Sequence, residues 1–166
     1  MNNVKKSTTY LTTAGLIAAL YVLLTFVANA LGLASQAIQV RFSEALTILP
    51  VFTGAAIPGL FVGCLLANLL TGCAFWDIVF GSLATLAGAI GTRYIGRKFP
   101  LTAPVFPILA NVIVVPIVLQ RVYGSPDSYP FLAATVGIGE LISCGLFGGL
   151  LYQALKKRHV FEHIPA

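Results

Sequence analysis

Polar side chains that could do chemistry are few in this sequence, and most of them lie inside or beside long apolar runs. The set consists of Arg41, Glu44, Asn68, Trp76, Asp77, Asn111 and Glu140. Carboxylates, a guanidinium and amides bind polar small molecules through hydrogen bonds, and an indole ring can stack on a flat ligand. Because ionisable groups inside apolar segments are costly, they are functional candidates by default. We therefore expect these residues to form a small-molecule site.

Each member of this set also has a purely structural interpretation, which the sequence leaves open. Arg41 and Glu44 could pair on one helical turn, and Asp77 could stabilise the start of a helix. Trp76 is typical of an interfacial aromatic belt, and the two asparagines could bridge helices. Glu140 is the strongest candidate, because a rise of about 1.5 Å per residue from Tyr129 places it about 16 Å below the outer end of the last span.

The composition indicates an all-α integral membrane protein. Of the 166 residues, 58% are hydrophobic and only 9% are charged, whereas soluble domains carry about 25% charged residues. The apolar runs far exceed the roughly 10 residues of a barrel strand, so the spans are helices. The net charge of +5 comes without a block of five or six basic residues, so nucleic acid is not the expected partner.

Six transmembrane helices in a single domain, residues 1–166, fit the apolar runs best. Four runs are clear, and the uncharged stretch 45–72 is either two short helices or one broken helix. The clear runs cover residues 10–33, 76–95, 101–120 and 131–155. Basic residues concentrate in cytoplasmic loops, and with six spans only Arg41 and Arg121 fall outside. We therefore predict a six-transmembrane-helix bundle with both termini cytoplasmic.

No catalytic or cofactor motif stands out. The tail carries the pattern H-x-x-E-H at residues 159–163, which is also found in inverted zinc proteases. It has no convincing third ligand, so we interpret it as a solvated tail and expect no metal and no cofactor. Because the phosphate-binding loop G-x-x-x-x-G-K-[ST] is absent, the chain is not expected to use ATP itself.

Several segments resemble the QueT family of membrane proteins. The most specific are I-Q-V-R-F-S-E-A-L at residues 38–46 and F-W-D-I-V-F-G-S-L-A-T at residues 75–85, with A-N-L at 67–69 between them. The resemblance implies a substrate-binding S component of an energy-coupling factor (ECF) transporter in a bacterial plasma membrane. It also implies a six-helix fold, which works with a coupling subunit and two cytoplasmic ATPases. The A-x-x-x-A pattern of Ala14 and Ala18 would contact the coupling subunit.

The resemblance further implies a queuosine precursor such as preQ1, a flat 7-deazaguanine with a cationic aminomethyl group. Glu44, Asp77 and Glu140 are candidates to accept hydrogen bonds from the guanine edge and the ammonium, in an order that the sequence leaves open. Asn68 or Asn111 could donate to O6, and Trp76 could stack on the ring. The alternatives are an S component for another vitamin, such as thiamin or riboflavin, and a small membrane enzyme that uses Glu140 and Asp77.

Overall fold

The computed structural model describes residues 2–33 and 38–158, and every regular element within them is helical. Their order along the chain is α1 (Asn2–Ala30), η1 (Phe42–Val51), α2 (Ala56–Leu70), α3 (Phe75–Gly91), η2 (Thr92–Gly96), η3 (Pro100–Thr102), α4 (Val105–Arg121), α5 (Tyr129–Glu140), η4 (Leu141–Phe147) and α6 (Gly148–Lys157). The elements η1 and η3 are 3₁₀ helices, and η2 and η4 are π-helical segments that continue α3 and α5.

Four helical stretches are long and apolar enough to cross a membrane. They are Lys6–Ala30, Phe75–Gly96, Pro100–Arg121 and Tyr129–Lys157, and two shorter apolar helices cover Phe42–Val51 and Ala56–Leu70. The ambiguous stretch between residues 45 and 72 is thus two helices joined by a turn. The all-helical fold is confirmed, whereas the six-span count and the cytoplasmic termini remain predictions, because η1 has only 10 residues.

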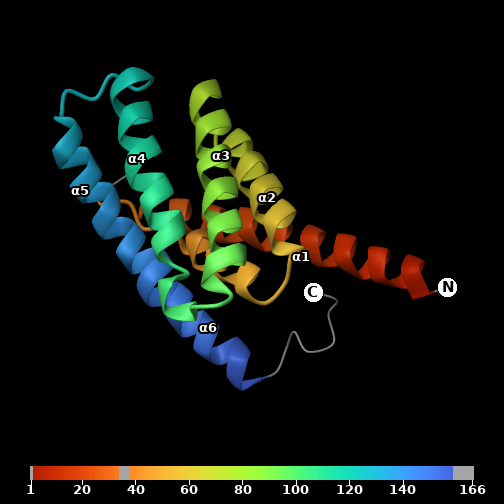
Figure 1. Ribbon diagram of the computed structural model, residues 1–166. Coiled ribbons are helices and arrows are strands. Elements are labelled where there is room, and N and C mark those ends of the chain that lie inside the picture. Colours follow the sequence, from red (N-terminus) through yellow and green to blue (C-terminus); the bar gives the residue numbers. More distant parts are fainter. Residues whose placement is uncertain (1, 34–37, 159–166) are drawn as a thin grey trace.

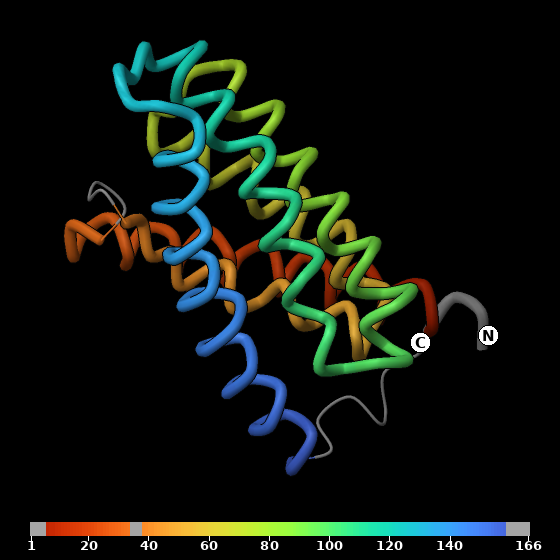
Figure 2. The backbone as a smooth tube through the Cα atoms, turned by 60° about the vertical axis from the view of Figure 1, so that its left-hand side comes forward, coloured from red at the N-terminus to blue at the C-terminus, as the bar shows by residue number. Residues whose placement is uncertain are grey.

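Helices that follow one another along the chain pack side by side. Helix α2 packs between α1 and α3, and α4 packs between α3 and α5. Helix α1 crosses the other helices at a large angle (Figure 1), and α5, η4 and α6 form one long helix along the opposite side of the bundle (Figure 2). The short η1 contacts α1, α2, α3, η2, η4 and α6, so it lies at the centre of the molecule.

The hydrophobic core forms where α1, η1, α2 and α3 meet. Its buried members are Ile17, Tyr21, Leu46, Leu49, Ala56, Leu60, Cys64, Ala67 and Ala89. Elsewhere the helices expose large apolar side chains, for example Leu16 and Leu23 of α1 at 61% and 58%. Such an apolar exterior is the expected surface of helices that face lipid.

Two glycines of α2 allow close contact with α1. A Cβ atom at Gly59 would lie 2.7 Å from the carbonyl oxygen of Ala14, and one at Gly63 would lie 3.0 Å from the Cα of Ala18. Small residues at such contacts let helix backbones approach. Ala18 is therefore buried against α2 and only 7% exposed. The Ala14 and Ala18 face, which was expected to contact a coupling subunit, thus packs against α2 in this structure, with Ala14 still partly exposed.

A second close contact fixes the segment that leads into η1. Gly139, near the end of α5, lies so close to the backbone of Gln39 that a Cβ atom at this position would clash with the Gln39 carbonyl oxygen. The backbone N–H of Arg41 donates to Ser143 Oγ in η4 at 3.1 Å. The residues between α1 and η1 are thus held against the α5–η4 helix, and π-helical segments such as η4 often occur at functional sites.

Candidate functional site

A cavity of about 400 Å³ lies between α1, α2, α3, α4 and the segment before η1. This volume lies in the range of about 300–1,000 Å³ that is typical of small-molecule sites. Its polar lining consists of Thr25, Asn29, Gln39, Arg41, Asn68, Thr71, Cys73, Asp77 and Tyr123, and its apolar lining of Ala28, Val115, Val118 and Leu119. The cavity lies at the end of the bundle where α2 joins α3.

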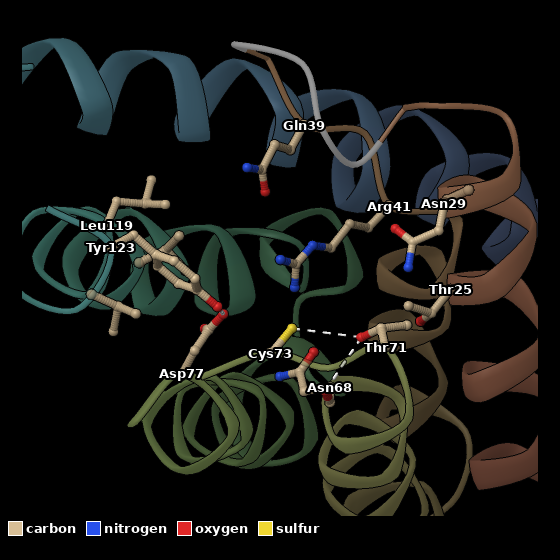
Figure 3. A pocket seen from close by; sticks show the side chains of 13 residues that line it. Thr25, Asn29, Gln39, Arg41, Asn68, Thr71, Cys73, Asp77, Leu119 and Tyr123 are labelled. Carbon is tan, nitrogen blue, oxygen red and sulfur yellow. Dashed lines mark hydrogen bonds between the residues drawn. The ribbon is translucent and has the colours of Figure 1, made fainter. Parts of the chain in front are cut away.

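Arg41 is the principal cation of this cavity. Its guanidinium extends into the cavity from the segment before η1 (Figure 3). Within the described part of the chain, the guanidinium makes no hydrogen bond or ion pair, although the charges of Glu44 and Asp77 act on it. The N–H donors of this guanidinium are therefore available to a ligand that fills the cavity.

Asp77 is the carboxylate of the cavity, and it is held by Tyr123. The Tyr123 hydroxyl donates to Asp77 Oδ2 at 2.8 Å and accepts from the backbone N–H of Ala74 at 3.1 Å. These bonds connect the first turn of α3 to the end of α4. Partial burial and the neighbouring Asp77 carboxylate raise the pKa of Tyr123 to about 12, so its phenol remains a donor near neutral pH.

The amide of Asn68 completes the polar wall of the cavity on α2. Asn68 is 4% exposed, and its Nδ2 lies 3.6 Å from Cys64 Sγ, one turn earlier on α2. Thr85 of α3 also donates to Cys64, at 3.3 Å. Gly81 lies opposite, since a Cβ atom there would be 3.2 Å from the Asn68 amide nitrogen. The close packing of α2 and α3 thus fixes where the Asn68 amide points.

Glu44 and Glu140 lie deeper, in a buried network with Cys144. Tyr21 donates its hydroxyl hydrogen to Glu44, Asn111 Nδ2 donates to Glu140 Oε1 at 2.9 Å, and Cys144 Sγ donates to Glu140 Oε2 at 3.1 Å. The carboxylates are 1% and 8% exposed. All buried side-chain nitrogen and oxygen atoms of the described residues have a hydrogen-bond partner.

Glu44, Glu140 and Cys144 also bring potential metal-ligand atoms within 4.8 Å of one another. Both carboxylates already accept hydrogen bonds from uncharged donors, and the thiol donates to one of them. We therefore interpret the cluster as a hydrogen-bonded network that connects α1, η1, α4 and the α5–η4 helix. The H-x-x-E-H pattern at residues 159–163 lies outside the described residues.

The network reaches the candidate site through a narrow second cavity of about 20 Å³. Arg41 lines both this cavity and the larger one, whereas Asn111 and Glu140 line only the narrow one. The fold thus brings Arg41, Asn68 and Asp77 together around the larger cavity, with Asn111 and Glu140 beside it. Glu44 lines neither cavity and instead fixes Tyr21.

The structure does not bring Trp76 to the cavity. Its side chain is 54% exposed on α3, and its ring stacks on Phe80 with the ring centroids 5.8 Å apart. With Phe75 it forms an exposed aromatic cluster, which is the arrangement of an interfacial belt. The aromatic ring at the cavity is that of Tyr123.

Sequence analysis missed several residues that line the cavity. They are Thr25, Asn29, Gln39, Thr71, Cys73 and Tyr123. Most of them lie at the ends of apolar runs that the topology brings to the same side of the membrane. A search for polar residues at the ends of the apolar runs could therefore have found them, Gln39 and Tyr123 in particular.

The long apolar helices define the class of the molecule as a helical membrane protein. The polar cavity at one end of the bundle is its candidate small-molecule site. The chain belongs to the QueT transporter family, because the model of that family, described as QueT transporter, matches residues 11–157. The match includes every described residue that lines the larger cavity. Comparisons with curated proteins and with solved structures gave no match.

Proposed function

We propose that this protein is the S component of an ECF transporter and binds a queuosine precursor, preQ1 or a related 7-deazapurine, in the 400 Å³ cavity. The observation that carries the proposal is a cavity in which the Arg41 guanidinium, which has no hydrogen-bond or ion-pair partner among residues 2–33 and 38–158, shares the space with the Asp77 carboxylate. A 7-deazaguanine offers complementary groups, because it has an acceptor at O6 and donors at N1 and the 2-amino group.

The roles of the cavity residues follow from their chemistry. Asp77 accepts from N1–H and the 2-amino group or from the aminomethyl ammonium, a charge-assisted contact in either case. Arg41 and Asn68 donate to O6, and the Tyr123 ring packs on the flat ligand. Val115, Val118 and Leu119 cover its remaining apolar surface. Trp76 has no role at the ligand in this arrangement.

Mass spectrometry of small molecules extracted from the purified protein tests the ligand class. We expect an intact 7-deazapurine in stoichiometric amount. Recovery of thiamin or riboflavin would contradict the queuosine assignment and favour an S component for another vitamin. Ligand that is consumed by the purified protein would favour a membrane enzyme. Asp127→Asn is a suitable control variant for binding assays, because Asp127 is an exposed carboxylate that does not line this cavity.

Delivery into the cell, in this proposal, depends on a coupling subunit and two ATPases in a bacterial plasma membrane. The Ala14 and Ala18 positions pack against α2, so we place the contact with the coupling subunit on the neighbouring, exposed face of α1, about 100° away. Gly15 and Ala19 are exposed there, four residues apart, and nothing lies within 4 Å of a Cβ atom at Gly15.

Two tryptophan substitutions on α1 test this placement. We expect Ala19→Trp to fold and to bind ligand but to lose assembly with the coupling subunit and cellular uptake. Ala18→Trp should instead destabilise the bundle, since overpacking costs about 1–3 kcal/mol or more. If Ala19→Trp assembles and transports normally, the exposed face of α1 is not the contact with the coupling subunit.

A further inference from the structure

A second large cavity lies at the other end of α3. Its volume is about 660 Å³, and its charged lining consists of Arg93, Arg97 and Lys98. None of the carboxylates in the described part of the chain lines it. Since Asp77 is in the first turn of α3 and Arg93 follows its last turn, the two cavities are separated by the length of the helix.

The cationic side chains are held in place by neighbouring elements. Arg93 Nη1 donates to the carbonyl oxygen of Pro50 at 3.1 Å, near the end of η1. On the other wall, the Tyr10 hydroxyl donates to the carbonyl oxygen of Gly54 at 3.2 Å. The cavity is therefore built from α1, the turn after η1 and the π-helical η2, with fixed donors around it.

Close packing fixes the position of η2 itself. Thr92 is buried and donates through Oγ1 to the carbonyl oxygen of Ala103 at 3.1 Å. A Cβ atom at Gly96 would lie 2.7 Å from the Cβ of Ala103. This contact holds the turn between α3 and α4 close to η2, so Arg97 and Lys98 project from a rigid support.

Arg93 and Arg97, two of the three cations, repel each other at this position. The charge of Arg97 acts on Arg93, and no ion pair with any of the three is present within residues 2–33 and 38–158. A bound anion would relieve this repulsion, and a phosphate group accepts several hydrogen bonds from guanidinium and ammonium groups at once.

The surroundings of the cations favour a lipid over a soluble phosphate. Tyr94 lines the cavity with the cations, and Phe99 and Leu101 follow Lys98 closely in the sequence; these three side chains are 71%, 62% and 96% exposed. A free phosphate would leave these apolar groups uncovered, whereas the acyl chains of a phospholipid can cover them. Basic pockets between transmembrane helices bind anionic lipid headgroups for this combined reason.

We propose that the cavity between Tyr10, Arg93, Arg97 and Lys98 binds the phosphate of an anionic phospholipid, with the acyl chains beside Phe99 and Leu101. The lipid fastens the turn between α3 and α4 to α1 at the end of the bundle opposite the candidate substrate cavity. The site is independent of the identity of the transported ligand.

Native mass spectrometry of the full chain, reconstituted with equal amounts of phosphatidylglycerol and phosphatidylcholine, tests this proposal. We expect the wild type to retain phosphatidylglycerol selectively. The double variant Arg97→Gln, Lys98→Gln should lower this selectivity by about 25-fold, since each of the two basic groups contributes about 5-fold near a lipid surface. The matched control Lys156→Gln, Lys157→Gln removes the same charge from α6, outside the cavity, and should retain the selectivity.

Equal losses in both double variants, or no loss in either, would overturn the proposal, because the selectivity would then reflect net charge or another site. A competition arm separates the two phosphate sources. Inorganic phosphate at millimolar concentration should not displace phosphatidylglycerol. If it does, the cavity is a site for soluble phosphate. Leu101→Ser tests the contact with the acyl chains. It should weaken retention of phosphatidylglycerol and leave thermal stability in lipid-free detergent unchanged. Unchanged retention would contradict that contact.

Discussion

The two cavities at the ends of α3 both contain arginine, but they surround it differently. Around Arg41 the cavity provides a carboxylate, amides and hydroxyl groups between four helices. Around Arg93 it provides two further cations and an exposed apolar margin. The first environment selects a small molecule with both donors and acceptors, whereas the second attracts any anion that can also cover apolar surface. The residue type alone therefore does not determine the ligand.

Of the substitutions that test the difference between the two cavities, removal of the Arg41 charge should have the largest effect on ligand affinity. We expect Arg41→Gln to weaken ligand binding by about 2–5 kcal/mol, the cost of losing one partner of a buried charged contact. Isothermal titration calorimetry with the extracted ligand measures this loss. Arg121→Gln is the matched control, since it removes an exposed cation at the end of α4. Equal losses in both variants would mean that Arg41 acts only through the net charge.

Asp77→Asn should have the next largest effect on the same measurement. The substitution keeps the size of the side chain and removes its charge, so the expected loss is about 1.5–3 kcal/mol, the contribution of a hydrogen bond to a charged group. Lipid selectivity at the other end of α3 should not change. A change in lipid selectivity would show that the two cavities are coupled, and they could then not be treated as independent sites.

Glu140→Gln tests whether the ligand occupies the 400 Å³ cavity around Arg41 or reaches into the narrow cavity of about 20 Å³ beside it. Because Glu140 lines only the narrow cavity and is already bonded to Asn111 and Cys144, we expect a loss in ligand affinity of about 1 kcal/mol, the contribution of an ordinary hydrogen bond. Binding and thermal unfolding should be measured together. A loss as large as that of Asp77→Asn, without a change in stability, would place the ligand against Glu140 instead.

The smallest expected effect on binding is that of Tyr123→Phe, which removes the hydrogen bond to Asp77. We expect a loss of about 0.5 kcal/mol in affinity, at the low end for a hydrogen bond because Tyr123 is about half exposed. A difference titration of tyrosinate absorbance between wild type and Tyr123→Phe should show one group with a pKa of about 12.

The direction of this titration also determines its effect on stability. The folded state favours the neutral phenol, so the stabilisation that Tyr123 provides is complete below the ordinary tyrosine pKa of about 10. It is lost as the pH rises from there through about 12. Asp77→Asn should lower the pKa of Tyr123, since it removes the carboxylate that disfavours a second negative charge. An unchanged pKa in that variant would leave burial as the whole cause.

Much of the fold could be predicted from the sequence, because membrane helices depend on local composition. The long runs at residues 76–95 and 101–120 correspond closely to Phe75–Gly96 and Pro100–Arg121. The interrupted stretch was more difficult, because Pro50 and the residues after it allow either a broken helix or two helices. The structure has two, and the first is a 3₁₀ helix buried at the centre of the bundle, a position that no periodicity indicates.

The candidate site was predicted in part. Arg41, Asn68 and Asp77 do line one cavity, but the partners that fix them come from distant parts of the chain. Tyr123 reaches Asp77 from the end of α4, and Ser143 holds the backbone of Arg41 from η4. Such pairings depend on how the helices pack, which a list of polar residues does not contain.

The sequence by itself determined that this is a helical membrane protein, where its long apolar segments lie and to which family it belongs, because these properties depend on local runs and motifs. The tertiary structure decided which side chains face a cavity. Trp76 and Asp77 are neighbours, yet a helix of 3.6 residues per turn rotates them about 100° apart. Packing against α4 then directs Asp77 to the cavity and Trp76 to the exposed surface. Similarly, the close packing of the α2 glycines against α1 fixes the rotation of α1 about its own axis. Ala18 therefore faces α2 and is buried, whereas Ala19 is exposed.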